Sequence, residues 1–406
     1  MREEKVILVG LQTREEDSHF NYSMGELAQL VDTAGGEVVM TFTQKRNTID
    51  SRTFVGKGKI QEISRAAEET QAQTIVFNQA LSPRQVRNIQ DVIEAKIIDR
   101  MQLILDIFAM RANSREGRLQ VELAQQEYLL PRLVGQGVNL SRLGGGIGTR
   151  GPGETQLESD RRYIQGRITD IKKELKKVSA HRERIRQRRQ DQQVFQIGLV
   201  GYTNAGKSTL LNALTQADTF EEDTLFATLD PLTRQYELES GMEVTLTDTV
   251  GFIQDLPTEL VAAFQSTLEE TRNMDLLLHV IDASSDYIEI QEETVVELLE
   301  DMDSHHIPRL AVYNKADLAD ADFVPQLSPH ITVSAKDEED VLRLHEAVEE
   351  HIKEILVPYR RILPAQEASE LAHMQKESLV TQWSFDDATN EYIVEGYAKP
   401  SSKWVT

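Results

Sequence analysis

The sequence predicts a multidomain α/β protein, and three observations support that prediction. Short apolar runs alternate with amphipathic segments over residues 1–100, which is the pattern of a parallel sheet covered by helices. Two long helical patterns then flank a stretch that is rich in glycine. Finally, residues 195–215 have the pattern of a strand, a glycine loop and a helix, the arrangement of a phosphate-binding loop.

Chain length and these patterns predict the domain organisation. The chain has 406 residues, which is enough for about two to four domains, each with its own core. The expected parts are an N-terminal α/β domain with a parallel sheet at 1–104, a helical hairpin of coiled-coil character at 105–193 with a glycine-rich tip loop at 135–156, a second α/β domain around the phosphate loop at 194–357, and a small α+β appendage at 358–406.

The net charge of the chain is −23, but its two halves differ in sign. Residues 1–190 hold 31 Lys and Arg against 25 Asp and Glu, whereas residues 191–406 hold 13 against 42. Such asymmetry suggests that the first half meets a polyanion while the second half keeps the protein dissolved. An acidic composition with chance clustering of basic residues is the alternative.

Composition also excludes several classes of protein. The chain has no cysteine, so a disulfide framework, a thiolate metal site and a cysteine nucleophile are excluded. No run of about 18 apolar residues predicts a membrane span, and the N-terminus lacks the pattern of a signal peptide. We therefore expect a cytoplasmic protein, with peripheral attachment to membranes left open as a second location.

The first 104 residues are expected to alternate between strands and helices. Ser82 has the residue type of an N-cap, and Pro83 suits a first helical turn. The loop Phe54–Lys59 can hold a phosphate through its backbone amides and lysines, but an ordinary strand-to-helix turn is the favoured interpretation. The predicted strands are Lys5–Gly10, Glu37–Phe42, Thr74–Phe77 and Lys96–Asp99, and the predicted helices are Met24–Thr33, Lys59–Glu69 and Ser82–Ile93.

Two helical patterns on either side of a glycine-rich stretch predict the hairpin. Met101–Leu133 is expected to be one continuous helix, and a second helix runs from Glu154 to about Gln190. Between them, Gly144–Gly153 holds six glycines and a proline, which neither a helix nor a packed strand accommodates. Apolar residues mark one face of each helix: Leu119, Leu123 and Leu130 on the first, and Ile164, Ile168, Ile171, Leu175 and Val178, at coiled-coil spacing, on the second.

The second helix is basic on its remaining faces. Residues 157–190 carry 12 Lys and Arg against five Asp and Glu, and the tip adds Arg142 and Arg150. One interpretation is a spacer with a solvated charged face. The other, which we favour, is an arm that inserts into RNA, with its basic side chains on phosphates and its glycine tip in confined space.

The stretch Gly201–Ser208 fits the pattern GxxxxGK[ST] between a strand and a helix. Gly201 and Gly206 let backbone N–H groups turn inward around phosphate oxygens, and the N-terminus of the helix adds unpaired donors. Lys207 is expected to meet the β- and γ-phosphates, and the Ser208 hydroxyl is a hard ligand for Mg²⁺. The predicted phosphate contacts are Gly201, Tyr202, Thr203, Asn204, Ala205, Gly206, Lys207, Ser208 and Thr209.

A second strand is expected to end at the phosphates. It leads into Asp248 and Gly251, with Thr249 and Val250 between them, 40 residues after Ser208. Asp248 can hold Mg²⁺ through water, and the Gly251 N–H can sense a γ-phosphate.

A third motif indicates which base is bound. The Asp317 carboxylate can accept from the N1–H and the 2-amino group of guanine, a pair of donors that adenine lacks. The alkyl stem of Lys315 can cover the base, and a backbone N–H after a further strand can meet the guanine O6. The predicted base contacts are Asn314, Lys315, Asp317, Ser334, Ala335 and Lys336. These motifs, in this order, predict GTP and not ATP.

A mobile loop between the first two motifs should supply a threonine hydroxyl to Mg²⁺ and a backbone N–H to the γ-phosphate. This loop contains Phe226 and Ala227, which are expected beside the nucleotide. Its candidate threonines are Thr224, Thr228 and Thr233, and physical arguments alone do not choose among them.

Phe252 follows Gly251, where Ras-like GTPases carry a glutamine that orients the attacking water. A phenyl ring cannot hydrogen-bond to water, so slow intrinsic hydrolysis is expected. A partner, another side chain or the substrate phosphate must then position the nucleophile.

Taken together, the chain resembles the HflX-type ribosome-associated GTPases of the Obg–HflX superfamily. The most specific match is the glycine-rich segment Gly145–Glu158 with Asp160-Arg161-Arg162 after it. The other matching segments are 202–209, 225–231 and 248–253, and further upstream 55–59, 99–100, 105–108 and 119–125.

The resemblance implies a Ras-like P-loop GTPase domain that converts GTP to GDP and phosphate with Mg²⁺. It also implies that Thr228 is the switch threonine, so that Lys207, Thr228, Asp248 and Gly251 would be catalytic. Ser208, Thr228 and Asp248 would bind the metal. The appendage beyond about residue 360 varies in the family, so no role is carried over to it.

The resemblance further implies partners and an activity. The partners would be the large (50S) ribosomal subunit and the 70S ribosome, with 23S rRNA contacted through residues 1–190, especially the basic hairpin. Hydrolysis would be stimulated there and stalled 70S ribosomes split or rescued, and we expect a monomer. A ribosome-assembly GTPase that holds subunit precursors is one alternative, and an RNA-binding module with a structural nucleotide is another.

Overall fold

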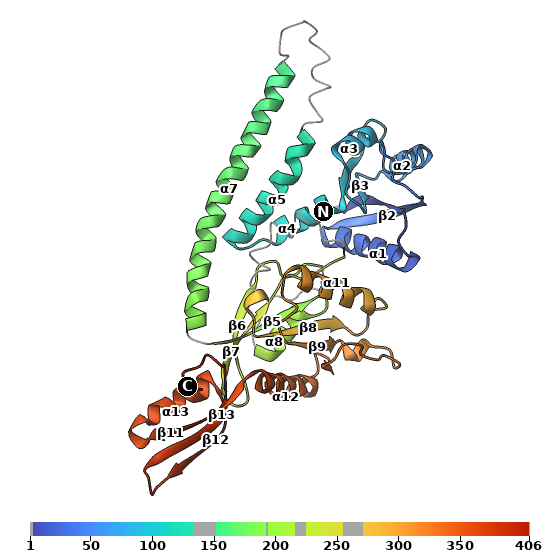
Figure 1. Cartoon of the computed structure of the whole chain (residues 1–406). Helices are drawn as coiled ribbons and strands as arrows, with labels where there is room; N and C mark the ends of the chain where they lie inside the picture. The colour runs from blue at the N-terminus through green and yellow to red at the C-terminus, as the bar shows by residue number, and fades with distance from the viewer. Residues whose placement is uncertain (1–2, 134–151, 192–193, 216–224, 255–270, 406) are drawn as a thin grey trace. The chain divides into compact units, whose positions relative to one another are not determined.

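The computed structural model describes residues 3–133, 152–191, 194–215, 225–254 and 271–405 (Figure 1). These residues form two compact units, one that ends at Val178 and one that begins at Ser179. The predicted tip residues Arg142 and Arg150, and the candidate Thr224, lie outside the described residues. Within the described ranges, no helix combines the length and the apolar character needed to cross a membrane.

The first unit contains the predicted parallel sheet. The strand order is β2-β1-β3-β4, and all neighbouring strands are parallel. The strands are β1 (Glu4–Gln12), β2 (Gly36–Lys45), β3 (Thr74–Phe77) and β4 (Lys96–Asp99), and the helices are α1 (Asp17–Thr33), α2 (Lys57–Thr70), α3 (Pro83–Gln90) and α4 (Arg100–Arg111).

The sheet is buried on both faces, which is why its inner strands are almost wholly apolar. On one face, Ile7, Val9 and Phe77 pack against Ile60 and Ile89 of α2 and α3. Helices α1 and α4 pack beside each other against the sheet as well. The start of α3 has the predicted N-cap, because Ser82 accepts from the Gln85 backbone N–H while the Gln85 side chain accepts from Ser82.

One predicted helix is two separate helices, and another begins earlier than predicted. Met101–Leu133 does not form one helix: α4 ends at Arg111, and α5 (Arg115–Leu133) begins after an extended Ala112. The Ser114 hydroxyl accepts from the Gly117 N–H at 2.8 Å and so starts a new helix. Helix α1 begins at Asp17, ahead of the predicted Met24, at an N-cap whose side chain makes no capping bond and therefore gives no sequence signal.

Helix α5 and the long helix α7 (Pro152–Asp191) lie side by side (Figure 1). Their seam contains Leu119, Leu123 and Ile171, with Ile168, Leu175 and Val178 packed against them. These six belong to the predicted apolar faces. Because α7 begins at Pro152, the last residues of the predicted tip loop, 152–156, are helical; proline suits a first helical turn. The predicted domain boundary at 104/105 falls inside α4.

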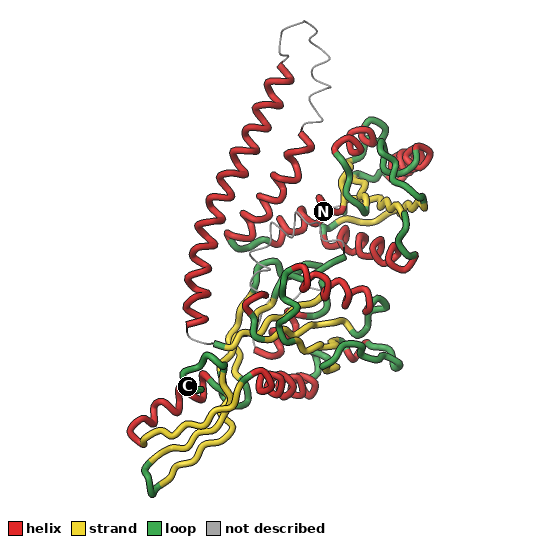
Figure 2. The backbone as a smooth tube through the Cα atoms, viewed as in Figure 1, coloured by secondary structure: helices red, strands yellow, loops and turns green. Residues whose placement is uncertain are grey.

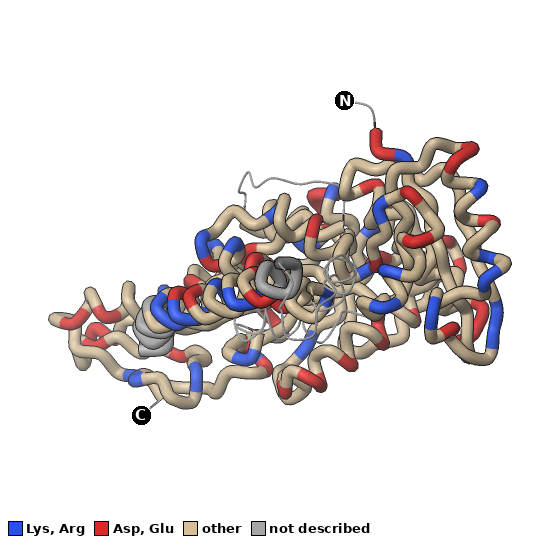
Figure 3. Tube along the Cα trace, turned by 90° about the horizontal axis from the view of Figure 1, so that it is seen from above, with Lys and Arg blue, Asp and Glu red and all other residues tan. Residues whose placement is uncertain are grey.

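Charged side chains cross the hairpin seam. Arg167 donates twice to Glu122, at 2.6 and 2.8 Å, and Lys172 pairs with Glu127 at 2.7 Å. Basic and acidic residues are accordingly interleaved in the described parts of the chain (Figure 3). Part of the positive charge counted in the sequence therefore neutralises acidic residues of the hairpin itself.

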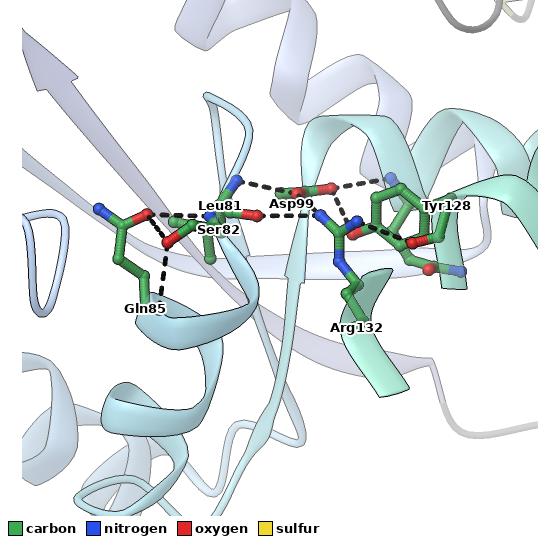
Figure 4. A network of polar contacts seen from close by, with 7 residues as sticks. Leu81, Ser82, Gln85, Asp99, Tyr128 and Arg132 are labelled. Carbon is green, nitrogen blue, oxygen red and sulfur yellow. Dashed lines mark hydrogen bonds and ion pairs between the residues drawn. The ribbon is translucent and has the colours of Figure 1, made fainter. Parts of the chain in front are cut away.

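A buried carboxylate joins the hairpin to the sheet of the first unit (Figure 4). Asp99, at the end of β4, accepts from the Tyr128 hydroxyl at 2.8 Å and from the Arg132 guanidinium at 3.1 Å, both on α5. It also accepts from the backbone N–H groups of Leu81 and Gln102. The Arg132 guanidinium lies 3.3 Å from the Tyr128 ring centre and donates to the Leu81 carbonyl. Burial raises the pKa of Tyr128, so its hydroxyl stays a donor.

The second unit contains a six-stranded sheet in the order β10-β9-β8-β5-β7-β6, in which only β6 is antiparallel to its neighbour among the described strands. Figure 2 distinguishes the strands of the chain from its helices by colour. Helices α8 and α12 contribute to its main core, and α11 contacts β5 and β8. The strands are β5 (Phe195–Gly201), β6 (Leu232–Glu237), β7 (Glu243–Asp248), β8 (Leu276–Asp282), β9 (Arg309–Asn314) and β10 (His330–Thr332), and the helices are α8 (Lys207–Thr215), α11 (Ile288–Asp301) and α12 (Glu338–Ile355).

The C-terminal part is an antiparallel sheet, β11-β13-β12, with one helix, α13. The sequence pattern predicts two strands here, Leu379–Phe385 and Glu391–Tyr397, and they are present as β12 and β13, whereas β11 is not predicted. Lys399 donates to Asp275 at 2.6 Å and to the Val194 carbonyl at 2.9 Å, so this part is tied to the starts of β8 and β5, the two central strands of the larger sheet. The elements are β11 (Val357–Pro364), α13 (Ala368–Glu377), β12 (Leu379–Asp386) and β13 (Glu391–Ala398), and the short 3-10 turns of the unit are Thr271–Asn273, Ala316–Leu318 and Ala365–Glu367.

Candidate active site

The loop between β5 and α8 requires glycine at two points. A Cβ at Gly201 would lie 2.2 Å from the Val280 carbonyl oxygen of the neighbouring strand. Gly206 has φ +90°, and a Cβ there would lie 2.2 Å from the Asn314 side-chain nitrogen. The loop backbone therefore lies against β8 and against the end of β9, and no larger residue fits at either point.

Lys207 is buried at the first turn of α8. Its ammonium donates to the carbonyls of Gly201 at 3.2 Å and Tyr202 at 2.9 Å, which hold it inside the loop. Burial lowers the pKa of Lys207 to about 8, against the opposing effect of the nearby Asp248 carboxylate. A polyphosphate in this loop would restore favourable surroundings for the ammonium.

Three oxygen-bearing side chains meet at the start of α8. The Ser208 hydroxyl lies 2.9 Å from that of Thr228 and donates to Asp248 Oδ2 at 2.7 Å. Asp248 is fully buried at the end of β7, and burial raises its pKa, with Lys207 opposing. Its other oxygen, Oδ1, has no hydrogen-bond partner among the described residues. The carboxylate therefore has coordinating capacity that the described residues do not use.

The three candidate switch threonines differ in position. Thr228 lies at the Ser208–Asp248 cluster. Thr233 does not, because its hydroxyl pairs with that of Thr247 at 3.0 Å between β6 and β7. Thr224 is outside the described residues.

The segment after Asp248 runs against the phosphate loop. The Thr203 N–H donates to the Phe252 carbonyl at 2.8 Å, and the Phe252 N–H donates to the Gly201 carbonyl at 3.1 Å. A Cβ at Gly251 would lie 2.8 Å from Thr203 Cγ2 and 3.0 Å from Lys207 Nζ, so Gly251 is in close contact with both. The Phe252 ring is buried in the core.

The predicted base contacts gather at the ends of β9 and β10. The Asn314 amide donates to the Ala205 carbonyl and accepts from the Ala335 N–H, both at 3.0 Å, and so joins the phosphate loop to the base site. Asp317 accepts from the Ser334 hydroxyl at 2.7 Å and remains exposed. Its free edge is available to a base.

Two residues that fix the base contacts in position, Asp282 and Asp340, were not predicted from the sequence. Lys315 has φ +61° and pairs with Asp282 at 2.7 Å, at the end of β8. The Ser334 N–H donates to Asp340 at 2.8 Å, in the first turn of α12. Asp282 could have been found as an acidic residue at the end of an apolar strand, whereas Asp340 carries no such signal.

Two adjoining cavities collect most of the predicted site residues. Gly206 and Thr209 border both. Tyr202, Ala205, Asp248 and Val250 lie beneath these surfaces as buried residues. The phosphate cavity is lined by Thr203, Asn204, Gly206, Lys207, Ser208, Thr209, Phe226, Ala227, Thr228, Thr249 and Gly251, and the base cavity by Gly206, Thr209, Asn314, Lys315, Asp317, Leu318, Ser334, Ala335 and Lys336.

The loop Phe54–Lys59 has the geometry of an ordinary turn. The Gly56 N–H, which a phosphate would need, donates to the Gln44 side chain at 2.8 Å. Lys59 pairs with Glu62 at 2.6 Å. Two of the groups that a phosphate would need are thus engaged within the first unit.

Comparison with known protein families places three models along the chain. Residues 21–109 match a model described as GTP-binding GTPase N-terminal, and residues 111–189 match a GTP-binding GTPase middle region. Residues 196–315 match a model described as 50S ribosome-binding GTPase.

Individual relatives match over nearly the whole chain. The GTPase HflX of Alkalihalophilus pseudofirmus is 54% identical over 396 residues, which cover 97% of this chain and 94% of that protein. The GTPase HflX of Escherichia coli is 42% identical over 395 residues, covering 95% and 92%. Among solved structures, a GTP-binding protein from Sulfolobus solfataricus in complex with GDP is 23% identical, covers 86% of this chain and 98% of its own, and has a TM-score of 0.44.

Proposed function

The chain belongs to the HflX family of GTPases, and from this we propose that it uses GTP to act on the large ribosomal subunit. It would bind the 50S subunit, have its GTP hydrolysis stimulated there, and split or rescue stalled 70S ribosomes. The observation that carries the proposal is the match of residues 196–315 to the 50S ribosome-binding GTPase model. We further propose that it works as a monomer in the cytoplasm.

The hairpin offers a surface for 23S rRNA. Lys176 and Lys177 of α7 are exposed, and no ion pair engages either of them within the described residues. Lys172 and Lys173, by contrast, pair with Glu127 and Asp170. Unpaired lysines are the ones that gain most from meeting phosphate, because they break no ion pair in doing so. We therefore assign the rRNA contact first to Lys176 and Lys177.

Mg²⁺ fits the cluster at the start of α8. Ser208, Thr228 and Asp248 bring hard oxygen donors together, and Oδ1 of the buried Asp248 has no hydrogen-bond partner among the described residues. These three residues would hold the ion, Asp248 through water. The ion would neutralise charge on the β- and γ-phosphates.

The other site residues would act on the nucleotide directly. Lys207 would exchange its bonds with the Gly201 and Tyr202 carbonyls for phosphate oxygens. The Gly251 N–H would bind the γ-phosphate, which couples the presence of GTP to the segment after β7. Asp317 and the Ala335 N–H would read the guanine edge.

Hydrolysis by the isolated protein is expected to be slow. Phe252, at the position that carries the water-orienting glutamine in Ras-like enzymes, is buried and cannot bind water. Slow turnover suits a switch that keeps GTP until its target stimulates it.

The test is to measure GTP hydrolysis by the protein alone and with 30S subunits, 50S subunits or 70S ribosomes, and to follow 70S dissociation on sucrose gradients. Stimulation by 50S and 70S, with loss of the 70S peak in GTP, is expected. Stimulation without dissociation would favour a ribosome-assembly GTPase, and no stimulation by any particle would contradict the proposal.

A pair of variants tests the hairpin in the same assay. The double variant Lys176→Gln/Lys177→Gln should bind 50S more weakly, with a salt dependence shallower by about one unit of slope per lost phosphate contact. The matched Lys176→Arg/Lys177→Arg variant keeps both charges and should bind like the parent protein. GTP affinity should be the same in all three.

A further inference from the structure

Thr203 lines the phosphate cavity, and its buried hydroxyl makes no hydrogen bond to any described residue. The residue is 6% exposed. The neighbouring hydroxyls are engaged, Ser208 and Thr228 with each other and Thr249 with the Leu199 carbonyl at 2.7 Å. A buried hydroxyl without a hydrogen-bond partner is unfavourable, so a group that occupies the cavity is expected to satisfy it.

Thr203 also lies beside the residues that would bind the γ-phosphate in the proposed function, on which this inference rests. Its Cγ2 and the Lys207 ammonium are 2.8 and 3.0 Å from the point where a Cβ on Gly251 would lie. Lys207 and the Gly251 N–H would bind the γ-phosphate, and the Thr203 side chain lies close to Gly251 as well. A rotation about its Cα–Cβ bond exchanges methyl for hydroxyl on the side that faces Gly251.

The backbone fixes this position. The Thr203 N–H donates to the Phe252 carbonyl at 2.8 Å, and Tyr202 and Phe252 form a parallel bridge. The same contact that turns the Phe252 ring into the core therefore holds Thr203 beside Gly251. The apolar Phe252 and the hydroxyl of Thr203 are therefore connected by the same backbone hydrogen bonds.

We propose that the Thr203 hydroxyl positions the water that attacks the γ-phosphorus, the task that Phe252 cannot perform. Oγ1 accepts a hydrogen bond from the water and directs the water oxygen at phosphorus. The new bond forms between the water oxygen and the γ-phosphorus while the bond from phosphorus to the β–γ bridging oxygen breaks. The electron pair of the broken bond leaves with GDP, and the water proton passes to a γ-phosphate oxygen, so Thr203 itself gains and loses no proton.

Thr203 is thus a positioning residue. Its role is tested separately from the ribosome proposal, because hydrolysis is measured on the protein alone. The variants are Thr203→Val, which keeps the shape and removes the hydroxyl, and Thr203→Ser, which keeps the hydroxyl and removes the methyl group. The readouts are single-turnover hydrolysis of γ-labelled GTP with protein in excess, and the affinities for fluorescent GTP and GDP analogues. Aluminium fluoride with the fluorescent GDP analogue then tests the transition-state arrangement.

Thr203→Val should lower the single-turnover rate constant by about 10- to 100-fold, leave both nucleotide affinities within about twofold, and fail to trap aluminium fluoride. Thr203→Ser should stay within about threefold of the parent rate. Thr233→Val, whose hydroxyl lies outside the cavity, is the control and should match the parent.

Either of two results overturns the proposal. A parent rate in Thr203→Val would mean that the hydroxyl is not used. Equal losses in Thr203→Val and Thr203→Ser would mean that Thr203 acts through packing against Gly251. If the valine variant does not bind the fluorescent GDP analogue, Thr203→Ala, which adds no bulk, replaces it with the same expected outcomes.

Discussion

The hydroxyl oxygens of Ser208 and Thr228 lie 2.9 Å apart, although 20 residues separate them in the chain. Ser208 belongs to the helix after the phosphate loop, and Thr228 to the segment that leads into β6. The Ser208 hydroxyl donates a hydrogen bond to the buried Asp248 carboxylate. The Thr228 side chain also lies close enough to lower the pKa of Asp248. The contact places a threonine from the expected switch segment where a metal-bound triphosphate would hold it.

Thr228→Ala should therefore separate GTP from GDP binding. Loss of the hydroxyl should weaken binding of a non-hydrolysable GTP analogue in Mg²⁺ by about 5- to 20-fold, through loss of one ion ligand, and leave GDP affinity within about twofold. Isothermal titration with both nucleotides measures the difference. Thr233→Ala is the matched control, because its hydroxyl pairs with Thr247 and not with the cluster. Equal losses for both nucleotides would exclude a switch role for Thr228.

Lys207 predicts how GTP affinity depends on pH. Because burial lowers the pKa of Lys207 to about 8, the ammonium increasingly loses its proton as the pH rises above that value. Bound phosphates favour the charged form and raise this pKa again. GTP binding should then weaken above pH 8, by at most about 10-fold per pH unit, and take up as much as about one proton near pH 9.

Titration calorimetry in two buffers of different ionisation enthalpy measures this uptake at pH 7 and pH 9. Uptake that is small at pH 7 and large at pH 9 is expected, since the lysine is mostly charged at the lower pH. A constant affinity from pH 7.5 to 9.5 with no uptake would show that Lys207 keeps its proton in the nucleotide-free protein.

The site was predictable from sequence to the extent that its chemistry lies in short segments. Gly201–Ser208, Asp248 and Asp317 stand at the ends of apolar strands, and the carboxyl ends of neighbouring parallel strands meet at one edge of a sheet. The side chains that hold these residues in position lie in other parts of the chain. Asp282 and Asp340 act from other strands and helices, across 33 and six residues of chain, and no spacing rule connects them to their partners.

In the fold as well, features set by local sequence patterns were predictable and features set by single contacts were not. The parallel sheet of the first unit was predictable because apolar strands alternate with helices, and the seam of α5 and α7 because its residues keep one helical face. The break between α4 and α5 was not, since it depends on one serine cap in a stretch that is otherwise favourable to helix. Strand β11 was missed because Val357–Pro364 carries prolines at both ends and two arginines, a composition that suits only an edge strand.

Asp317→Asn tests the base site. The amide donates where the carboxylate accepted, so it opposes the guanine 2-amino group and matches a 2-keto group. GTP affinity should fall by about 10- to 100-fold, and the variant should prefer xanthosine triphosphate. Asp322→Asn, an exposed neighbour outside the base cavity, is the control. Unchanged GTP affinity in Asp317→Asn would refute the assignment of the base site.

The carboxylate that joins the hairpin to the first sheet predicts a local loss of stability. Arg132→Met keeps the length of the side chain over Tyr128 but removes the ion pair with the wholly buried Asp99. Asp99 keeps its three other donors, so the loss should be about 1–3 kcal/mol, below that of a fully isolated buried charge. Both tryptophans, Trp383 and Trp404, lie in the C-terminal sheet region, so their fluorescence would not report it.

Hydrogen exchange measures that loss where it occurs. The backbone N–H groups of Leu81 and Gln102 donate to Asp99, and peptides that contain them should exchange faster in Arg132→Met, whereas peptides from β5 should not change. Tyr128→Phe removes one neutral donor and leaves the ion pair, so its effect should be the smaller of the two. If Arg132→Met leaves both amides as protected as in the parent protein, Asp99 does not depend on Arg132. The packing of α5 against α4 must then hold the hairpin to the sheet without the ion pair.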